Sequence, residues 1–172
     1  MKYFCGVVAA VLCFGVTQAV FAADNELTDR EKQEGWILLF DGKTLNGWET
    51  SDEKPSVKPV EDGCINPHGC GAYYMMPAER FADYELRLDF KTSPKCNSGI
   101  LLRAEPKFGD AFGGDTGYYA LEVAIDDALD SGYHATGAIY DLVPVATRVL
   151  KPAGEWNHVE IYCKDNIVKV AI

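Results

Sequence analysis

The chain has 172 residues, and its 26 acidic side chains outnumber its 16 basic ones, which gives a net charge of −10. Such a chain is not expected to bind nucleic acid, because contacts with phosphates require a basic face that releases counterions. With 48% hydrophobic and 24% charged residues, the composition excludes wholesale disorder, and the length predicts one globular domain.

The first 22 residues have the features of a cleavable secretory signal. Lys2 precedes an apolar run, residues 4–16, and residues 20–22 supply the small or apolar side chains that a signal peptidase recognises. The run is shorter than the roughly 20 residues that span a bilayer, so export is favoured over a retained membrane anchor. We therefore expect an exported protein, periplasmic or secreted, with no membrane attachment once the signal is removed.

A short helix is expected immediately after the signal. Thr28 and Glu31 have the spacing of a capping box, which predicts an acidic helix that continues through Glu34 and ends at Gly35. This helix belongs to a lead-in, residues 23–34, that precedes the main domain.

After the helix, short apolar segments alternate with turn residues such as Asp41-Gly42. Residues 84–90 show the period of two that is typical of a strand with one buried face. Because no crossover helices separate the segments, we predict an all-β fold, an antiparallel sandwich, over residues 35–172. The predicted strands cover residues 36–40, 84–90, 98–103, 118–126, 136–143, 159–163 and 167–172.

The last predicted strand follows a turn at residues 164–166 and stops without a polar tail. Natural sheets usually cover or charge an apolar edge of this kind. We therefore expect a chain that is truncated at its C-terminus.

The exported form retains four cysteines, and an even number in an exported chain favours disulfides over catalytic thiols. Cys64 and Cys70 bracket a turn-forming spacer, and we expect them to form a disulfide. A zinc site made from Cys64, His68 and Cys70 is not favoured, because it has too few ligands at poor spacing. The partners of Cys96 and Cys163 stay open.

Glu122 and Asp126 are candidate catalytic carboxylates in the predicted strand 118–126. Four residues apart on one strand, they are too distant to share a proton but close enough to lie on two sides of one bound ligand. The alternative is a pair of solvated charges on an outward face. The opposite, buried face is expected to carry Leu121, Val123 and Ile125.

Arg103 and Asn97 come from another predicted strand. Arg103 shares a face with Gly99, whose small size lets a ligand or another strand approach closely. An arginine there can hold an anionic intermediate or pair with Glu122. An arginine–carboxylate pair that only balances charge within the sheet is an equal alternative. Asn97 offers donor and acceptor groups to ligand hydroxyls, and ordinary turn chemistry is its alternative.

His134 lies in a loop of small residues, 131–135, from which a base or a metal ligand can reach the mouth of the sheet. An exposed loop histidine without a function is the commoner case. Tyr118 is a candidate substrate-binding residue.

Four short segments, in order along the chain, carry a specific combination of residues. They read GWILLFDGKTLNGW at 35–48, NSGILLR at 97–103, TGAIY at 136–140 and GEWN at 154–157. Together they resemble successive signatures of the 3-keto-disaccharide hydrolase domain family. The resemblance spans residues 35–172 and implies a concanavalin A-like jelly-roll sandwich of two antiparallel sheets, in an exported protein that acts on sugars.

The resemblance implies cleavage of 3-keto-glycosides by β-elimination and hydration. A ketone at C3 acidifies the C2 proton, a base removes it, the enolate expels the C1 oxygen, and water adds back. Glu122 or Asp126, with His134 as the less favoured alternative, is expected to be the base. Arg103 is expected to stabilise the enolate. We assign no cofactor, and leave open a divalent cation that assists Arg103. A separate sugar oxidoreductase must supply the ketone.

The competing hypothesis is a glycan-binding, lectin-like module without catalysis, because the same sandwich also serves lectins. Exposed aromatic side chains for sugar stacking, such as Tyr73, Tyr74 or Tyr118, suit that hypothesis. A scaffold fragment without activity is a third hypothesis, and the expected truncation favours it.

The signal predicts cleavage after Ala22 when the chain is secreted by a suitable host. Intact-mass measurement of the secreted protein should find a chain that begins at Ala23. A secreted chain that still begins at Met1 would contradict this prediction.

Overall fold

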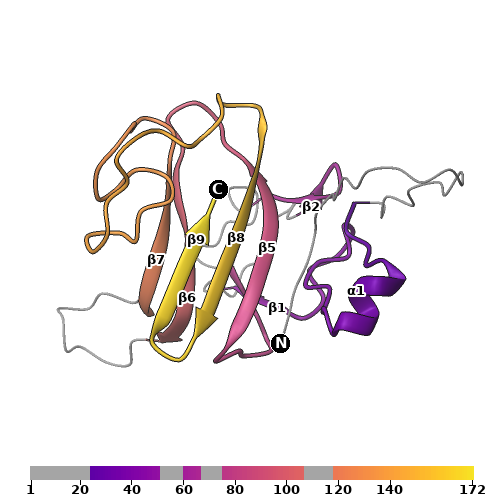
Figure 1. The fold of residues 1–172 in the computed structure, drawn as a ribbon. Coiled ribbons are helices and arrows are strands. Elements are labelled where there is room, and N and C mark those ends of the chain that lie inside the picture. Colours follow the sequence, from indigo (N-terminus) through magenta and orange to yellow (C-terminus); the bar gives the residue numbers. More distant parts are fainter. Residues whose placement is uncertain (1–23, 51–59, 67–74, 107–117) are drawn as a thin grey trace, which may run out of the picture. The chain divides into compact units, whose positions relative to one another are not determined.

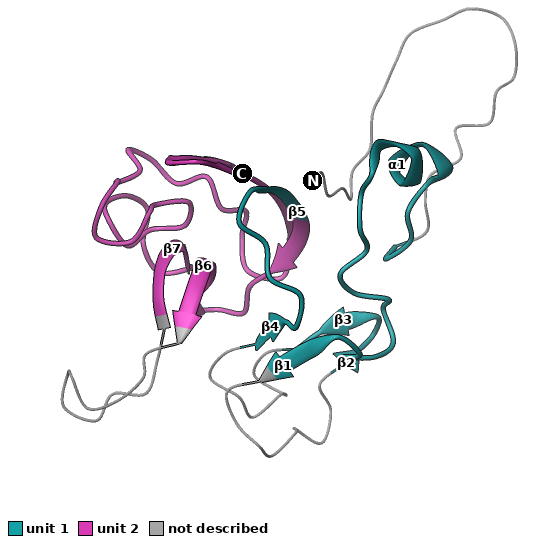
Figure 2. Cartoon of the chain, turned by 90° about the horizontal axis from the view of Figure 1, so that it is seen from below, with its two compact units in different colours: residues 1–87 teal, residues 88–172 magenta. Residues whose placement is uncertain are grey.

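The computed structural model describes residues 24–50, 60–66, 75–106 and 118–172. Within these ranges the chain forms nine strands and one short helix, which confirms the predicted all-β class with its N-terminal helix (Figure 1). The strands pair as antiparallel ladders where a register is resolved. The chain divides into two compact units, residues 1–87 and residues 88–172 (Figure 2).

In the first unit, helix α1, Asp29–Glu34, begins with the predicted capping box. The Thr28 hydroxyl accepts a hydrogen bond from Glu31 N at 3.2 Å, and the Glu31 carboxylate accepts one from Thr28 N at 2.7 Å. The helix ends at Gly35, whose φ of 84° lies in the left-handed region that favours glycine. Local sequence signals therefore define both ends of this helix.

The strands of the first unit are short. Strand β1, Trp48–Thr50, pairs antiparallel with β4, Met75–Pro77. Strands β2, Val60–Glu61, and β3, Cys64–Ile65, form a hairpin. Its turn, residues 62–63, has positive φ at both positions, 51° and 74°, as a two-residue hairpin with the twist of its strands requires.

The prediction of a strand at residues 36–40 is wrong, because this segment joins no ladder. Its apolar character comes from burial instead: Trp36 is only 5% exposed, and the Arg87 guanidinium lies 4.5 Å from the centre of its ring. Its backbone makes hydrogen bonds outside any ladder: Leu39 O accepts from Trp48 Nε1 at 2.7 Å, and Trp36 N donates to Glu31 O at 3.0 Å. An apolar run without alternation does not distinguish a strand from a buried segment that joins no sheet.

The turn predicted at Asp41-Gly42 is present. The Asp41 carboxylate accepts hydrogen bonds from Thr44 N at 2.7 Å and Lys43 N at 2.8 Å, and Gly42 has a φ of 75°. These backbone donors lower the pKa of the Asp41 carboxyl.

The second unit contains two antiparallel ladders. Strand β6, Asn97–Pro106, pairs with β7, Tyr118–Asp126. Strand β8, Trp156–Lys164, pairs with β9, Ile167–Ala171, and the turn predicted at residues 164–166 is found at residues 165–166. Strand β5, Tyr84–Lys91, whose residues 88–91 belong to this unit, precedes β8 and β9 in the order β5-β8-β9.

The prediction of a continuous strand at residues 136–143 is also wrong. These residues form only isolated bridges, which join Ile139 to Val123 and to Val143. The chain turns at Gly137, whose φ is 91°, and turns again after residue 139, so no regular ladder develops.

Alternate residues of the strands supply the core of the second unit. Leu121 was predicted to be buried, but it is 38% exposed, whereas Val123 and Ile125 are buried as predicted. Ala124, on the opposite face, is buried as well, so burial follows the strand period only in part. The buried side chains, each at most 7% exposed, include Leu102, Val123, Ile125, Val159, Ile161 and Cys163.

The described cysteines Cys64, Cys96 and Cys163 form no disulfide with one another. Cys70 lies outside the described residues, so the Cys64–Cys70 bond stays a prediction. The expected signal also lies outside the described residues, as do His68, Tyr73 and Tyr74. In the part of the chain that the structure describes, no helix is long and apolar enough to cross a membrane.

We predict that Ile161→Ala destabilises the protein by about 2–5 kcal/mol, because it leaves a cavity in the core of the second unit. Ile167→Ala is the matched control: its side chain is 50% exposed, and the expected change is within about 0.5 kcal/mol. Chemical denaturation measures both free energies of unfolding. Equal losses in the two variants would contradict the described core.

Candidate functional site

β7 has hydrogen-bonded neighbours on both edges, and this arrangement positions the candidate residues. On one edge, β6 pairs with it in continuous register up to a bulge between Leu102 and Glu105. On the other edge lie residues 136–140, which we call the bridging segment. The facing pairs of β6 and β7 include Asn97 with Asp126, Gly99 with Ala124, and Leu101 with Glu122.

The bridging segment places Tyr140 beside Glu122. Val123 and Ile139 form an antiparallel bridge, and next to it Tyr140 N donates to Glu122 O at 2.9 Å. Residues that face each other across an antiparallel pair have side chains on the same face. The Tyr140 and Glu122 side chains therefore lie on one face of β7.

The Glu122 side chain lies over Gly99. A Cβ built on Gly99 would stand 2.2 Å from Glu122 Oε1 and 2.6 Å from its Cγ, closer than real Cβ contacts come. Any side chain at position 99 would therefore displace Glu122. The close approach that the sequence predicts at Gly99 is made by this carboxylate.

The environment of Glu122 changes its acidity. Partial burial raises the pKa of the Glu122 carboxyl, and the electrostatic interaction with His134 acts in the opposite direction. Among the described residues, no hydrogen-bond donor to this carboxylate is found. A carboxyl with a raised pKa and no structural partner is suited to proton transfer.

His134 is held by two contacts within its own loop. Its Nε2 lies 2.6 Å from Asp141 Oδ1, and its ring stacks on Tyr140 with the centroids 4.2 Å apart and an angle of 12° between the planes. The structure thus brings Glu122 and His134 into one site. Asp141 and Tyr140 are functional candidates that sequence reasoning missed.

The sequence contains little signal for Asp141. Its φ of 59° lies in the left-handed region, where aspartate is more tolerated than most residues, but many turn aspartates share that property. Its role depends on His134, seven residues earlier, and that contact forms only when the loop has folded.

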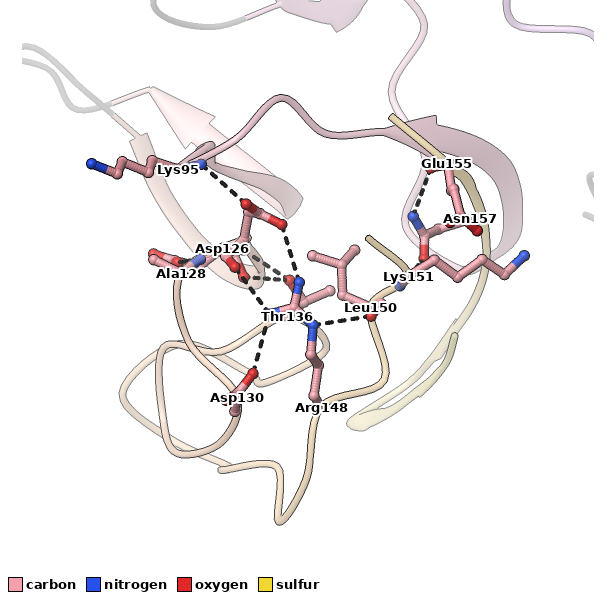
Figure 3. Close-up of polar contacts among 11 residues, drawn as sticks. Lys95, Asp126, Ala128, Asp130, Thr136, Arg148, Leu150, Lys151, Glu155 and Asn157 are labelled. Atoms are coloured by element: carbon pink, nitrogen blue, oxygen red, sulfur yellow. Dashed lines mark hydrogen bonds and ion pairs between the residues drawn. The ribbon is translucent and has the colours of Figure 1, made fainter. Parts of the chain in front are cut away.

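The loop that carries His134, residues 127–150, is closed by Arg148 (Figure 3). The guanidinium donates to Leu150 O at 3.1 Å, to the Asp127 carboxylate at 3.1 Å and to the Asp130 carboxylate at 3.2 Å. We call residues 127–150 the site loop. Arg148 ties its beginning to its end.

Asp126 and Asn97 face each other across β6 and β7, but their surroundings are those of a turn. The Asp126 carboxylate accepts from Ala128 N at 2.7 Å, and Asp126 N donates to the Thr136 hydroxyl at 2.8 Å (Figure 3). Asn97 is exposed. The Asp126 carboxylate therefore holds the turn that joins β7 to the site loop. The Glu122 carboxylate, in contrast, accepts no such backbone hydrogen bond from the described residues.

Arg103 lies in the bulge of β6 with a φ of 51°, and its guanidinium donates to Asp165 O in the turn between β8 and β9. This contact places the Arg103 guanidinium at the turn between β8 and β9. Tyr118 is the first residue of β7, and its side chain lies outside what the structure describes.

A metal site is not formed by the described residues. Across residues 24–50, 60–66, 75–106 and 118–172, no three His, Cys, Asp or Glu side chains are grouped as ligands for an ion.

Comparisons with known proteins agree with the resemblance found in the sequence. A family model described as 3-keto-alpha-glucoside-1,2-lyase-like domain matches residues 35–172. A curated relative from Bacteroides thetaiotaomicron, named 3-keto-disaccharide hydrolase, is 30% identical over 151 residues. The match covers 74% of this chain and 52% of the relative, so the chain spans about half the length of the curated relative it matches.

Solved structures show the same fold. A crystal structure of a candidate glycosyl hydrolase from Parabacteroides distasonis matches with a TM-score of 0.69 and 26% identity, over 87% of this chain and 73% of that one. A second candidate glycosyl hydrolase from the same species matches with a TM-score of 0.52 and 23% identity, over 74% of this chain and 63% of that one, and it supports the fold alone.

We predict that Gly99→Ala moves the Glu122 side chain toward solvent and lowers the pKa of its carboxyl, because the new methyl occupies its place. The φ of Gly99 lies outside the left-handed region, so alanine fits the backbone. NMR titration of the Glu122 carboxyl measures the change, with Ser98→Ala, the neighbour on the opposite face, as the control. An unchanged Glu122 titration in Gly99→Ala would contradict this geometry.

Proposed function

The chain belongs to the 3-keto-alpha-glucoside-1,2-lyase-like domain family, and on that premise we propose that it cleaves 3-keto-glycosides by elimination across C1 and C2, followed by hydration. The observation that carries this proposal is the Glu122 carboxylate, which has a raised pKa, lies over Gly99 and is close to His134. The site thus offers a base without a structural partner beside a second acid–base group.

The names of the family and of the relative describe two parts of one reaction. A 1,2-lyase breaks the bond between C1 and the leaving oxygen after loss of the C2 proton, and a hydrolase describes the net result once water has added. Both names support a carbohydrate substrate with a ketone at C3. The raised pKa of Glu122 supports a group that takes the C2 proton and later returns it.

Glu122 is a better candidate for the base than Asp126. The Asp126 carboxylate already accepts a backbone hydrogen bond at 2.7 Å, which occupies one of its oxygens. We leave Arg103 outside the proposed base site, because its described contact is with the turn at Asp165. Asn97 stays a candidate for binding sugar hydroxyls, since it is exposed at the end of the same face.

The proposed reaction requires a preceding step, and the predicted signal indicates where the reaction takes place. The C3 ketone must first be made from a hydroxyl, so the proposal includes a separate sugar oxidoreductase as the source of the substrate. Export by the N-terminal signal, residues 1–22, would place the domain where extracellular glycosides are available.

We predict that Glu122→Gln, made in the full chain, lowers turnover of a 3-keto-glycoside about 100-fold or more, the usual scale for a positioned base. Asp126→Asn is the matched control and should have a much smaller effect, since its amide oxygen can still accept from Ala128 N. Turnover is followed by release of the leaving group.

The mechanism is checked by running the wild-type reaction in deuterated water. Elimination requires exchange of the C2 proton with solvent, whereas direct displacement at C1 does not. Cleavage without C2 exchange would overturn the mechanism, and full activity of Glu122→Gln would overturn the assignment of the base. Sugar binding without turnover would support a lectin-like module instead.

A further inference from the structure

The proposed elimination needs a second proton-transfer group at C1. When the C1–O bond breaks, the departing oxygen takes the electron pair, and an alkoxide is a poor leaving group unless it receives a proton. Glu122, as the base, receives the proton from C2 in the same stage. A different side chain must therefore supply the proton to the leaving oxygen.

His134 is built into the site as such a group. Its side chain is 46% exposed, so a substrate can reach it, yet its ring is fixed by the stack on Tyr140 and by the contact with Asp141. Tyr140 in turn lies opposite Glu122 across the antiparallel pairing, on the same face of β7. The chain of contacts from Glu122 through Tyr140 to His134 places the two groups on one side of the sheet.

The contact with Asp141 decides which ring nitrogen is available. A carboxylate can only accept a hydrogen bond, so the Nε2 atom that lies 2.6 Å from Asp141 Oδ1 must carry a hydrogen. In the neutral ring Nδ1 is then the acceptor, and in the protonated ring Nδ1 carries the second proton. Asp141 thereby leaves Nδ1 as the atom that exchanges protons with a ligand.

We propose that His134, through Nδ1, is the acid–base group at the C1 oxygen, and that Asp141 is its positioning residue. This inference rests on the proposed function. In elimination, Glu122 takes the C2 proton while the imidazolium of His134 gives its Nδ1 proton to the leaving oxygen, and the sugar becomes an enone with a C1–C2 double bond. The aglycone departs as an alcohol.

The second half of the cycle restores both groups. The neutral Nδ1 of His134 takes a proton from water as the water oxygen bonds to C1, and the protonated Glu122 returns a proton to C2. The product is the free 3-keto sugar, and each residue regains its starting state. Two groups with separate positions thus account for both steps, with water as the only added reactant.

A second histidine–aspartate pair in the same unit provides a matched control. His158 Nδ1 lies 2.8 Å from Asp89 Oδ1, and the His158 side chain is 39% exposed, similar to that of His134. His158 lies on β8, a strand that contributes none of the candidate site residues. A general effect of losing a surface histidine or its ion pair should appear equally in this pair.

The test compares leaving groups. The substrates are a 3-keto-glucoside with a para-nitrophenyl leaving group, which departs readily as its anion, and a 3-keto-disaccharide, whose sugar alkoxide needs a proton. In the full chain, His134→Gln should lower kcat/KM about 100-fold on the disaccharide and have little effect on the nitrophenyl substrate, because only the former needs the acid. Asp141→Asn should show the same selectivity with a smaller loss, and His158→Gln should show neither.

The outcomes separate this inference from the proposed function. Equal losses on both substrates in His134→Gln, or no loss on the disaccharide, would overturn the role of His134 while leaving Glu122 as the base. A loss of activity in Glu122→Gln on both substrates, together with a selective loss in His134→Gln, supports the division between C2 and C1. A wild-type chain that cleaves neither substrate would overturn the proposed function and this inference with it.

Discussion

The pairing of β7 on both edges is the constraint on which the candidate site depends. The register with β6 places Gly99 beneath the Glu122 carboxylate, and the bridge between Val123 and Ile139 places Tyr140 opposite Glu122. A shift of one residue on either edge would move Glu122 to the core face. The buried Val123, which is 0% exposed, opposes such a shift, because the change would expose it to water.

Much of the fold could be predicted from the sequence where the signal is local. The capping box at Thr28, the period of two in residues 84–90 and the turn that joins β8 to β9 each depend on a few adjacent residues. The bounds of β7 were also predicted, because alternation continues until Asp126. The choice of Glu122 as a candidate site residue was based on the same alternation, which places its side chain on the face opposite Val123.

The remaining features depend on contacts between residues that are distant in the sequence. Nothing within NSGILLR indicates the bulge at Arg103, which directs its guanidinium to the turn at Asp165. Likewise the apolar residues of TGAIY indicate a strand, although the turns on both sides of Ile139 limit them to isolated bridges. Asp141 could not be assigned a role before the folded site loop brought it to His134.

The raised pKa of Glu122 connects the stability of the fold to the chemistry of the site. A carboxyl whose pKa is higher in the folded state than in the unfolded state stabilises the fold fully at pH below its unfolded pKa. That contribution is lost as the pH rises through the folded pKa, because the folded state then holds a partly desolvated charge. A neutral side chain at position 122 would avoid this loss and would serve a purely structural role better. The presence of glutamate over Gly99, beside an imidazole that counteracts part of the shift, therefore supports the proposed role in proton transfer.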